Sequence, residues 1–301
     1  MRILVLGDFQ GKFPSRLKRN LQKESFDLVI GVGDYGGIDD WRPWIKKDFE
    51  RSAKKGLPRL SPEEFFGKRK LRELINKDIK STKDVFYKLS KLKKKFIFIY
   101  GNGDDYWYNH PEYWDNQSLK KQKRFLRRFN NFKGITYSKT RFKGFGFIGF
   151  GGYMDIDAYF NTDDLRYQTK PMVRKRLKIY ARMRKRFFRL LSEAYKGDKN
   201  KDNKIFVFHY PPTGVFDIIK GGWKGNPMKG KSSGVRFYKE AIKRYKPRLV
   251  LCGHMHEYSG FKKMNNGKTL VVNPGDAGEG KYAIVEFTGD KADKIKVIMR
   301  K

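Results

Sequence analysis

Six acidic, amide and imidazole side chains stand just after five short apolar runs of the chain. These residues are Asp8, Asp34, Asn102, His209, His254 and His256. Carboxylate and amide oxygens bind hard divalent cations, and neutral imidazoles bind transition metals. Two such ions about 3.5–4 Å apart can clamp a phosphoryl group and make water nucleophilic near neutral pH. The set therefore predicts a metal site, and a pair of ions there could act on phosphate esters.

Each of these signals is weak when it stands alone. An Asp that follows a strand and a Gly usually accepts backbone N–H groups in a turn, and a single His at a strand end is usually structural. His254 and His256 are separated by one residue, and in an extended chain both rings would lie on the same side. Because all six residues occur in the same setting, metal binding is favoured over six separate structural roles.

The apolar runs before these residues predict the strands that position them. The runs cover residues 2–6, 28–32, 96–100, 205–208 and 249–252, with a further run at 145–150. Continuous β-branched and aromatic runs of this length are typical of strands buried on both faces. Glycines after the runs let the backbone turn sharply, so that the next side chain can point into the crevice at the carboxyl edge of the sheet. The pattern predicts an α/β fold with the site at that edge.

Two charged segments interrupt this pattern and predict helical insertions, at about residues 39–94 and 156–200. In the first, Pro58 and Pro62 break a helical pattern. In the second, apolar residues recur at three-, four- or seven-residue steps, which indicates one buried helix face. These residues are Val173, Leu177, Tyr180, Phe187 and Leu191. No repeat or linker divides the chain, so we expect a single domain over residues 1–301.

The formal net charge of +37 is extreme for a chain of this length. Self-repulsion of that size favours an anionic partner or high salt, and nucleic acid, nucleotides and acidic membrane surfaces all fit. A lysine-rich proteome in which Lys only solvates the surface fits equally well. The strongest local bias lies between Arg166 and Arg189, where there are eleven Lys or Arg residues and no acid.

The remaining composition favours a cytoplasmic protein. Cys252 is the only cysteine, which excludes an intrachain disulfide. The apolar run at the N-terminus soon reaches Asp8 and is typical of a strand, not of a signal peptide. No run approaches the roughly 18 apolar residues of a membrane-spanning helix. We therefore expect a soluble protein without a membrane span.

The order of the motifs resembles that of the calcineurin-like metallophosphoesterases. The motifs are GDFQ, GDYGG, GNGDD, FHYPPTGVFD, CGHMHEYSG and VVNPG. The last three are similar to those of a phosphodiesterase-type subgroup with H-x-P-P-x-G-x-x-D, G-H-x-H-E and N-P-G. The resemblance covers about residues 1–38, 96–105, 144–155 and 204–287. It implies a four-layer α/β fold, in which helices flank a central β-sandwich.

The resemblance also implies two sets of metal ligands that share one carboxylate. The first ion would be held by Asp8, Gln10, Asp34 and His256. The second would be held by Asp34, Asn102, His209 and His254. The usual ions in the family are Mn²⁺, Fe, Zn²⁺ and Ni²⁺, and a hydroxide that bridges them would attack phosphorus in line.

Two departures from the family pattern change the expected chemistry. Gln10 replaces the usual His of Asp-x-His, and its neutral carbonyl oxygen favours Mn²⁺ over Zn²⁺. Gly103 replaces the His that in the family protonates the leaving group or stabilises the transition state. This resembles relatives that act on phosphodiesters and keep Gly-Asn-x-Asp, with Asp104 retained. We therefore predict a phosphodiesterase with Asp34, Asn102 and Asp104 as catalytic residues.

Three functions remain open from the sequence. The first is a metal-dependent phosphodiesterase that acts on small molecules or nucleotides. The second is a nuclease that binds RNA or DNA through its basic insertions. The third is a phosphate-binding or nucleic-acid-binding protein with an impaired site, because Gln10 and Gly103 depart from the pattern. The aromatic residues 106–108 could line a substrate pocket or pack beneath an insertion, and the His-Pro setting of His110 indicates a loop.

Overall fold

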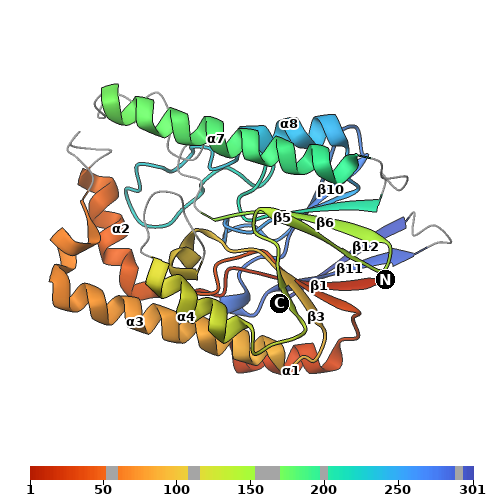
Figure 1. The fold of residues 1–301 in the computed structure, drawn as a ribbon, viewed down its shortest axis with the longest axis horizontal. Helices are drawn as coiled ribbons and strands as arrows, with labels where there is room; N and C mark the ends of the chain where they lie inside the picture. The colour runs from red at the N-terminus through yellow and green to blue at the C-terminus, as the bar shows by residue number, and fades with distance from the viewer. Residues whose placement is uncertain (52–59, 108–115, 153–169, 197–202, 289–293) are drawn as a thin grey trace.

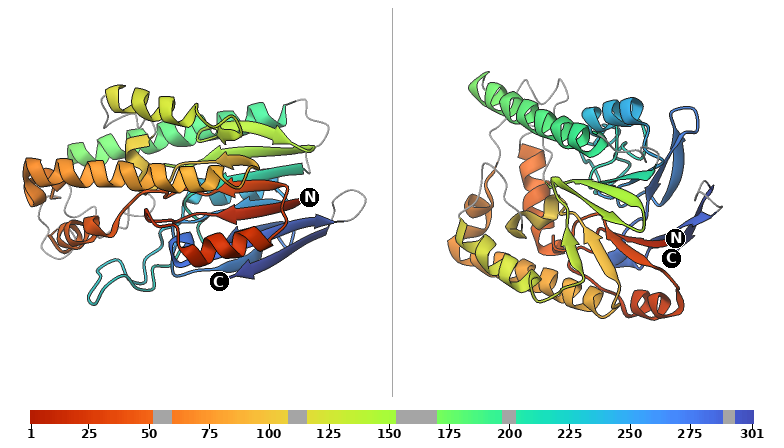
Figure 2. Two further views of the ribbon diagram at one scale, coloured as in Figure 1. Left: turned by 90° about the horizontal axis from the view of Figure 1, so that it is seen from below. Right: turned by 45° about the vertical axis from the view of Figure 1, so that its right-hand side comes forward.

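Two six-stranded mixed sheets lie face to face and form a sandwich (Figures 1 and 2). The computed structural model describes residues 1–51, 60–107, 116–152, 170–196, 203–288 and 294–301. The first sheet has the order β12-β11-β1-β2-β3-β4, in which β1 to β4 are parallel and β11 and β12 are antiparallel to their neighbours. Its strands are β1 (Arg2–Leu6), β2 (Leu28–Gly31), β3 (Lys95–Phe98), β4 (Phe132–Gly134), β11 (Tyr282–Thr288) and β12 (Lys294–Arg300).

The second sheet has the order β5-β6-β7-β8-β10-β9, with a parallel centre and an antiparallel strand at each edge. Its strands are β5 (Ser138–Phe142), β6 (Phe145–Phe150), β7 (Lys204–Phe208), β8 (Leu249–Leu251), β9 (Gly260–Met264) and β10 (Thr269–Asn273). The predicted strands are therefore present, with ends that agree to within two residues.

Helices cover the outer faces of both sheets. The first sheet is covered by α1 (Ser15–Lys23), α3 (Pro62–Ser90) and α4 (Asn116–Leu126), and the second by α7 (Lys170–Tyr195) and α8 (Arg236–Tyr245). The 3₁₀ turns η1 (Asp39–Trp41), η3 (Asn102–Trp107) and η5 (Ala277–Glu279) and the helix α2 (Arg42–Phe49) lie in the connections. The predicted four-layer architecture is confirmed.

Side chains of the central strands alternate between two buried environments. In β1, Ile3 and Val5 face the core between the sheets, whereas Leu4 and Leu6 pack against the helices on the outer face. All four are fully buried. Because both faces of these strands are covered, the sequence shows continuous apolar runs instead of alternating ones.

The described parts of the two predicted insertions are helical. Pro62 lies in the first turn of α3, which is capped by Ser61, and the helix is kinked at Gly67. In α7, Phe187 and Leu191 are fully buried as predicted, but Leu177 is 47% exposed, so its predicted place on the buried face is wrong. The side chain of Val173 lies outside the described residues. Among the helices of the described chain, none is long and apolar enough to cross a membrane.

Candidate metal centre

Strands of both sheets end at one edge of the sandwich, where the predicted site residues meet. Four of these residues have left-handed backbone conformations: Asp8 (φ 55°), Gln10 (φ 49°), Asp34 (φ 55°) and His254 (φ 68°). Such conformations cost a non-glycine residue roughly 1–2 kcal/mol each. Backbone hydrogen bonds between the first two loops help to offset this cost, because Asp8 N–H donates to the Gly33 carbonyl and the N–H of residue 9 donates to the Asp34 carbonyl. The strained turns direct the side chains toward one another.

Asn102 lies at the centre of the first group of converging side chains. Its Oδ1 is 2.8 Å from Nε2 of His209 and 2.8 Å from Nδ1 of His254. Nε2 of His209 is also 3.4 Å from Oδ1 of Asp34. Atoms of Asp34, His209 and His254 are close enough to hold one metal ion.

The protonation of His209 tests whether a cation fits this group. Nδ1 of His209 lies 2.8 Å from the Val32 carbonyl, which can only accept a hydrogen bond. Nδ1 therefore carries the hydrogen of the neutral ring, and the lone pair of Nε2 points at another acceptor, Oδ1 of Asn102. Two acceptors at 2.8 Å repel each other unless a cation or an added proton lies between them, or the Asn102 amide turns by about 180° and donates from its nitrogen. The donor set thus fits a metal ion.

A second group of converging side chains contains Asp8, Asp34 and His256, and it shares Asp34 with the first. Nε2 of His256 is 3.3 Å from Oδ1 of Asp8. Gln10 completes the group, but its amide nitrogen faces Oδ2 of Asp34 and Nε2 of His256, each at 3.4 Å. A turn of the amide by about 180° would present the carbonyl oxygen instead.

Burial shapes the protonation of these groups. Burial raises the pKa of Asp34, against the effect of His209, and the nearby Asp8 carboxylate adds to the rise. Burial also holds the pKa of His254 well below its usual range, so this ring is neutral. Burial disfavours the charged form of His256, but the Asp8 carboxylate raises its pKa to about 9. The buried carboxylates thus attract positive charge to the centre.

Asp104 lies beneath the metal centre, and its carboxylate is turned to the backbone instead of to the centre. The side chain is fully buried, and its two oxygens accept four backbone N–H groups at 2.8–3.1 Å. The donors are the amides of Asp34, Tyr35, Gly36 and Gly101. Both oxygens accept hydrogen bonds that tie the loop of Asp34 to the loop of Asn102, and the catalytic role of Asp104 stays a prediction.

Three further residues support the centre, and the motifs did not indicate a role for any of them. Asp78 of α3 accepts the Gly37 N–H at 2.9 Å and the indole N–H of Trp41 at 3.0 Å. The hydroxyl of Ser233 lies 3.0 Å from Nε2 of His254. Asp276 lies 3.8 Å from Nδ1 of His256. Asp78 stands in a charged helix and Ser233 in a loop, where neither spacing nor residue type distinguishes them from surface residues.

A cavity of about 310 Å³ opens beside the centre. Gln10 and Asp276 belong to its lining, as do Lys12 and Arg42, both of which form ion pairs with Asp39. The cavity is large enough for a small organic group next to the metal ligands. His110 and Tyr108, and the side chains of Tyr106 and Trp107, lie outside the described residues.

Comparisons with known proteins agree with this geometry. The family model described as metallophosphoesterase, calcineurin superfamily, matches residues 1–297. A comparison with curated protein sequences finds no significant match. One solved crystal structure is 20% identical, with a TM-score of 0.60, and the match covers 99% of this chain and 98% of the other, which supports the fold.

Two further solved structures have TM-scores of 0.49. One is TT1561 of Thermus thermophilus, with 16% identity and coverage of 98% of this chain and 97% of the other. The second is a dimetal phosphatase from Danio rerio, with 10% identity and coverage of 100% and 95%.

Proposed function

The chain belongs to the metallophosphoesterases of the calcineurin superfamily, and on this premise we propose that it hydrolyses phosphodiester bonds with the help of two divalent metal ions. Asp8, Gln10, Asp34 and His256 would hold one ion. Asp34, Asn102, His209 and His254 would hold the other. The contact that carries the proposal is that of Oδ1 of Asn102 with ring nitrogens of His209 and His254, both at 2.8 Å. A cation between these atoms would be held by an amide oxygen and two imidazole nitrogens, a donor set that suits a divalent metal ion.

Two ions at this place would supply Lewis acidity, which neutralises charge on the phosphoryl oxygens and makes water acidic enough to attack near neutral pH. The oxygen-rich first set, with a neutral amide at Gln10, favours Mn²⁺ over Zn²⁺. Fe and Ni²⁺ also suit a mixed set of oxygen and imidazole ligands. Among the described residues Asp34 is common to both groups, and it would therefore contribute a ligand to each ion.

The other residues of the centre position these ligands. The Val32 carbonyl fixes the tautomer of His209, and the Ser233 hydroxyl can do the same for His254 by accepting from Nε2–H. Asp104 joins the loop of Asp34 to the loop of Asn102 through backbone hydrogen bonds, and we assign it a positioning role. Fixed ligands need little reorganisation when charge develops on the substrate, which lowers the barrier.

The preference for diesters rests on Gly103 and on the cavity. The N–H of Gly103 donates to Oδ1 of Asp34 at 2.6 Å, and the residue has no side chain that could compensate the second negative charge of a monoester. A diester carries one charge and a second organic group. The cavity beside Gln10 has room for that group, and its lining includes Lys12 and Arg42.

A metal-dependent screen tests the proposal. The purified chain, stripped with chelator and reloaded with Mn²⁺, Zn²⁺, Fe²⁺ or Ni²⁺, is assayed on bis-p-nitrophenyl phosphate and on p-nitrophenyl phosphate. We expect diester turnover that depends on metal and is lost in Asp34→Asn. Asp84→Asn, a change of the same type at an exposed residue that pairs with Lys88, is the matched control.

Two outcomes would count against the proposal. Retained diester turnover in Asp34→Asn would exclude the shared carboxylate from the mechanism. Metal binding without turnover of either ester would support the alternative of a binding protein with an impaired site.

A further inference from the structure

The outer surface of α7 carries a row of cations. The helix contains ten Lys or Arg residues and one acid, Glu193. Five exposed members recur at steps of four, four, three and four residues, which places them along one side of the helix. They are Arg174, Lys178, Arg182, Lys185 and Arg189. At 1.5 Å per residue the row is about 22 Å long.

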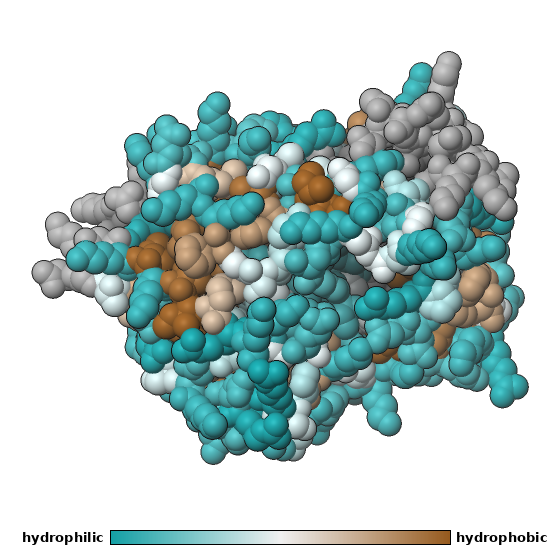
Figure 3. Space-filling model, turned by 180° about the vertical axis from the view of Figure 1, so that it is seen from behind, coloured by the Kyte–Doolittle hydropathy of each residue, from teal (hydrophilic) through white to brown (hydrophobic). Residues whose placement is uncertain are grey.

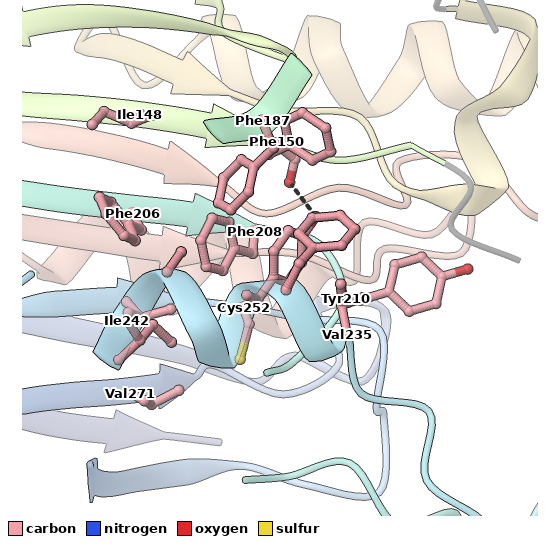
Figure 4. Close-up of a cluster of buried hydrophobic side chains, with 14 of the residues drawn as sticks. Ile148, Phe150, Phe187, Phe206, Phe208, Tyr210, Val235, Ile242, Cys252 and Val271 are labelled. Atoms are coloured by element: carbon pink, nitrogen blue, oxygen red, sulfur yellow. Dashed lines mark hydrogen bonds between the residues drawn. The ribbon is translucent and has the colours of Figure 1, made fainter. Parts of the chain in front are cut away.

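The opposite side of α7 is fixed to the second sheet. Phe187 and Leu191 are fully buried, and Phe187 packs against Phe150 and Phe208 in the cluster drawn in Figure 4. Burying a phenyl group of this kind contributes roughly 1.5–3 kcal/mol. Because these contacts set the rotation of the helix, the row of cations faces away from the core.

The helix α8 widens the basic surface. Tyr180 packs on Phe237, Arg184 pairs with Glu240, and Tyr195 packs on Tyr245, so the two helices run side by side in the same direction (Figure 1). Lys239, Lys243 and Arg244 of α8 are exposed. Side chains along the upper edge in Figure 3, where these helices lie, are mostly hydrophilic.

The helix α3 provides an internal comparison. It contains eight Lys or Arg residues but also five acids, and its cations form ion pairs within the helix. These pairs include Lys68–Glu63, Arg69–Glu73 and Lys88–Asp84. If the charge came only from a lysine-rich composition, acidic residues would offset the Lys and Arg residues to a similar extent in both helices. The excess of positive charge is therefore larger on α7, with ten Lys or Arg residues against one acid, than on α3.

From these features we propose that the surface of α7 and α8 binds the phosphate backbone of a nucleic acid. A row about 22 Å long suits a chain of repeated phosphates better than one small anion. A membrane-binding helix would insert its apolar face into the lipid, but the apolar face of α7 is buried against the sheet.

The orientation of α7 connects this surface with the metal centre. The helix precedes β7 in the chain and runs in the opposite direction (Figure 1). Its N-terminal end therefore lies at the carboxyl edge of the strands, where His209 follows β7. A strand bound along the row would extend toward that edge, and we infer that the substrate of the proposed phosphodiesterase is a nucleic acid. This second step rests on the proposed function, whereas binding itself does not.

A charge-removal experiment tests the binding surface. Arg174→Gln, Lys178→Gln and Lys185→Gln are combined in the full chain, since Gln keeps helix propensity and removes three charges. The matched control removes three exposed charges from α3: Lys68→Gln, Arg72→Gln and Lys80→Gln. Binding of a fluorescent 20-nucleotide single-stranded RNA is measured in chelator, where hydrolysis cannot occur, at several salt concentrations. Circular dichroism checks folding of both variants.

We expect the α7 variant to lose at least about tenfold in affinity at 0.1 M salt, and the slope of log K against log salt to become about 2 units shallower. The α3 control is expected to change affinity by less than threefold. Equal losses in both variants would overturn the proposal in favour of general charge attraction. Binding to vesicles with 30% phosphatidylserine is measured in the same way. If the α7 changes weaken vesicle binding more than RNA binding, the proposal is overturned in favour of a membrane.

Failure of this inference can be distinguished from failure of the proposed function. The α7 variant is expected to turn over bis-p-nitrophenyl phosphate at the unaltered rate, because α7 contributes none of the metal ligands. Normal RNA binding without any diester turnover would contradict the proposed function alone. Normal diester turnover with RNA binding unaffected by the α7 changes would contradict this inference alone.

Discussion

The hydroxyl of Ser233 lies 3.0 Å from Nε2 of His254, on the side of the ring away from Asn102. Since burial keeps His254 neutral, one ring nitrogen carries a hydrogen and the other has a lone pair. A hydrogen bond from Nε2–H to Ser233 leaves the lone pair of Nδ1 directed at the metal position. When the Ser233 hydroxyl accepts this hydrogen bond, His254 is in the tautomer that can bind a metal through Nδ1.

Ser233→Ala is therefore expected to weaken binding of one metal ion about tenfold and to leave the other site intact, because partners of metal-bound histidines typically contribute 10–100-fold to affinity. Titration calorimetry with Mn²⁺ measures both sites. Ser90→Ala, at the end of α3, is the control. Equal weakening of both sites would indicate a general disturbance of the centre and contradict the tautomer argument.

Asp104→Asn is expected to destabilise the fold by roughly 2–4 kcal/mol, because each carboxylate oxygen accepts two backbone N–H groups and an amide NH₂ would face two of these donors. Urea unfolding measures the loss of folding free energy. Because the metal ligands themselves are retained in this variant, excess metal should restore part of its diester turnover. A residue that transferred a proton to substrate would behave differently. It would leave stability unchanged and remove one limb of the pH–rate profile, which would restore the catalytic role expected from the sequence.

The sequence indicates the places of the site residues well because strand periodicity and strand ends are local. Asp8, Asp34 and His209 each follow an apolar run, and the carboxyl ends of parallel strands must share an edge. The left-handed backbone at Asp8, Gln10 and Asp34 could not be predicted, because it depends on hydrogen bonds between loops that are 24 or more residues apart. The membership of the metallophosphoesterases predicted from the motifs is confirmed, and the diesterase activity stays a prediction.

Contacts supplied by helices were not visible in the sequence. In the sequence Asp78 resembles any acid in a charged helix. In the structure it is buried and accepts a hydrogen bond from the Gly37 N–H in the loop after Asp34. The predicted burial of Leu177 was wrong. The apolar pattern continues toward the N-terminal end of α7, beyond the part of the helix that packs tightly on the sheet. In both cases the burial of the side chain depends on contacts with distant parts of the chain, which a local sequence pattern does not contain.

Asp78 is expected to make stability depend on pH, because burial raises its pKa from 3.8 to about 6. A raised carboxyl pKa means that the folded state binds the proton more tightly than the unfolded state. The contribution of Asp78 to stability is thus complete below about pH 4 and declines as pH rises to about 6, by about 3 kcal/mol at 1.36 kcal/mol per pH unit.

Urea unfolding of the natural chain and of Asp78→Asn from pH 4 to pH 8 isolates this contribution, since every other group titrates in both proteins. The stability of the natural chain relative to the variant should fall between pH 4 and pH 6 and then remain level. A difference that rises with pH would mean that the hydrogen bonds from Gly37 and Trp41 hold the pKa of Asp78 below its usual value.

Gly103→His is expected to shift the enzyme toward monoesters. An imidazolium at this position can compensate the second charge of a monoester and stabilise charge that develops in the transition state. A Cβ atom there would lie 3.2 Å from Oδ1 of Asp34 and 3.4 Å from Cα of Gly37, so the loop must shift by a few tenths of an ångström. The ratio of kcat/KM for p-nitrophenyl phosphate to that for bis-p-nitrophenyl phosphate should rise at least about tenfold near pH 6, and this rise should disappear at high pH as the ring loses its proton. Gly103→Ala introduces the same crowding without the imidazole and should leave the ratio unchanged. If Ala changes the ratio as much as His does, crowding against Asp34 is the cause, and the diester preference does not depend on the missing histidine.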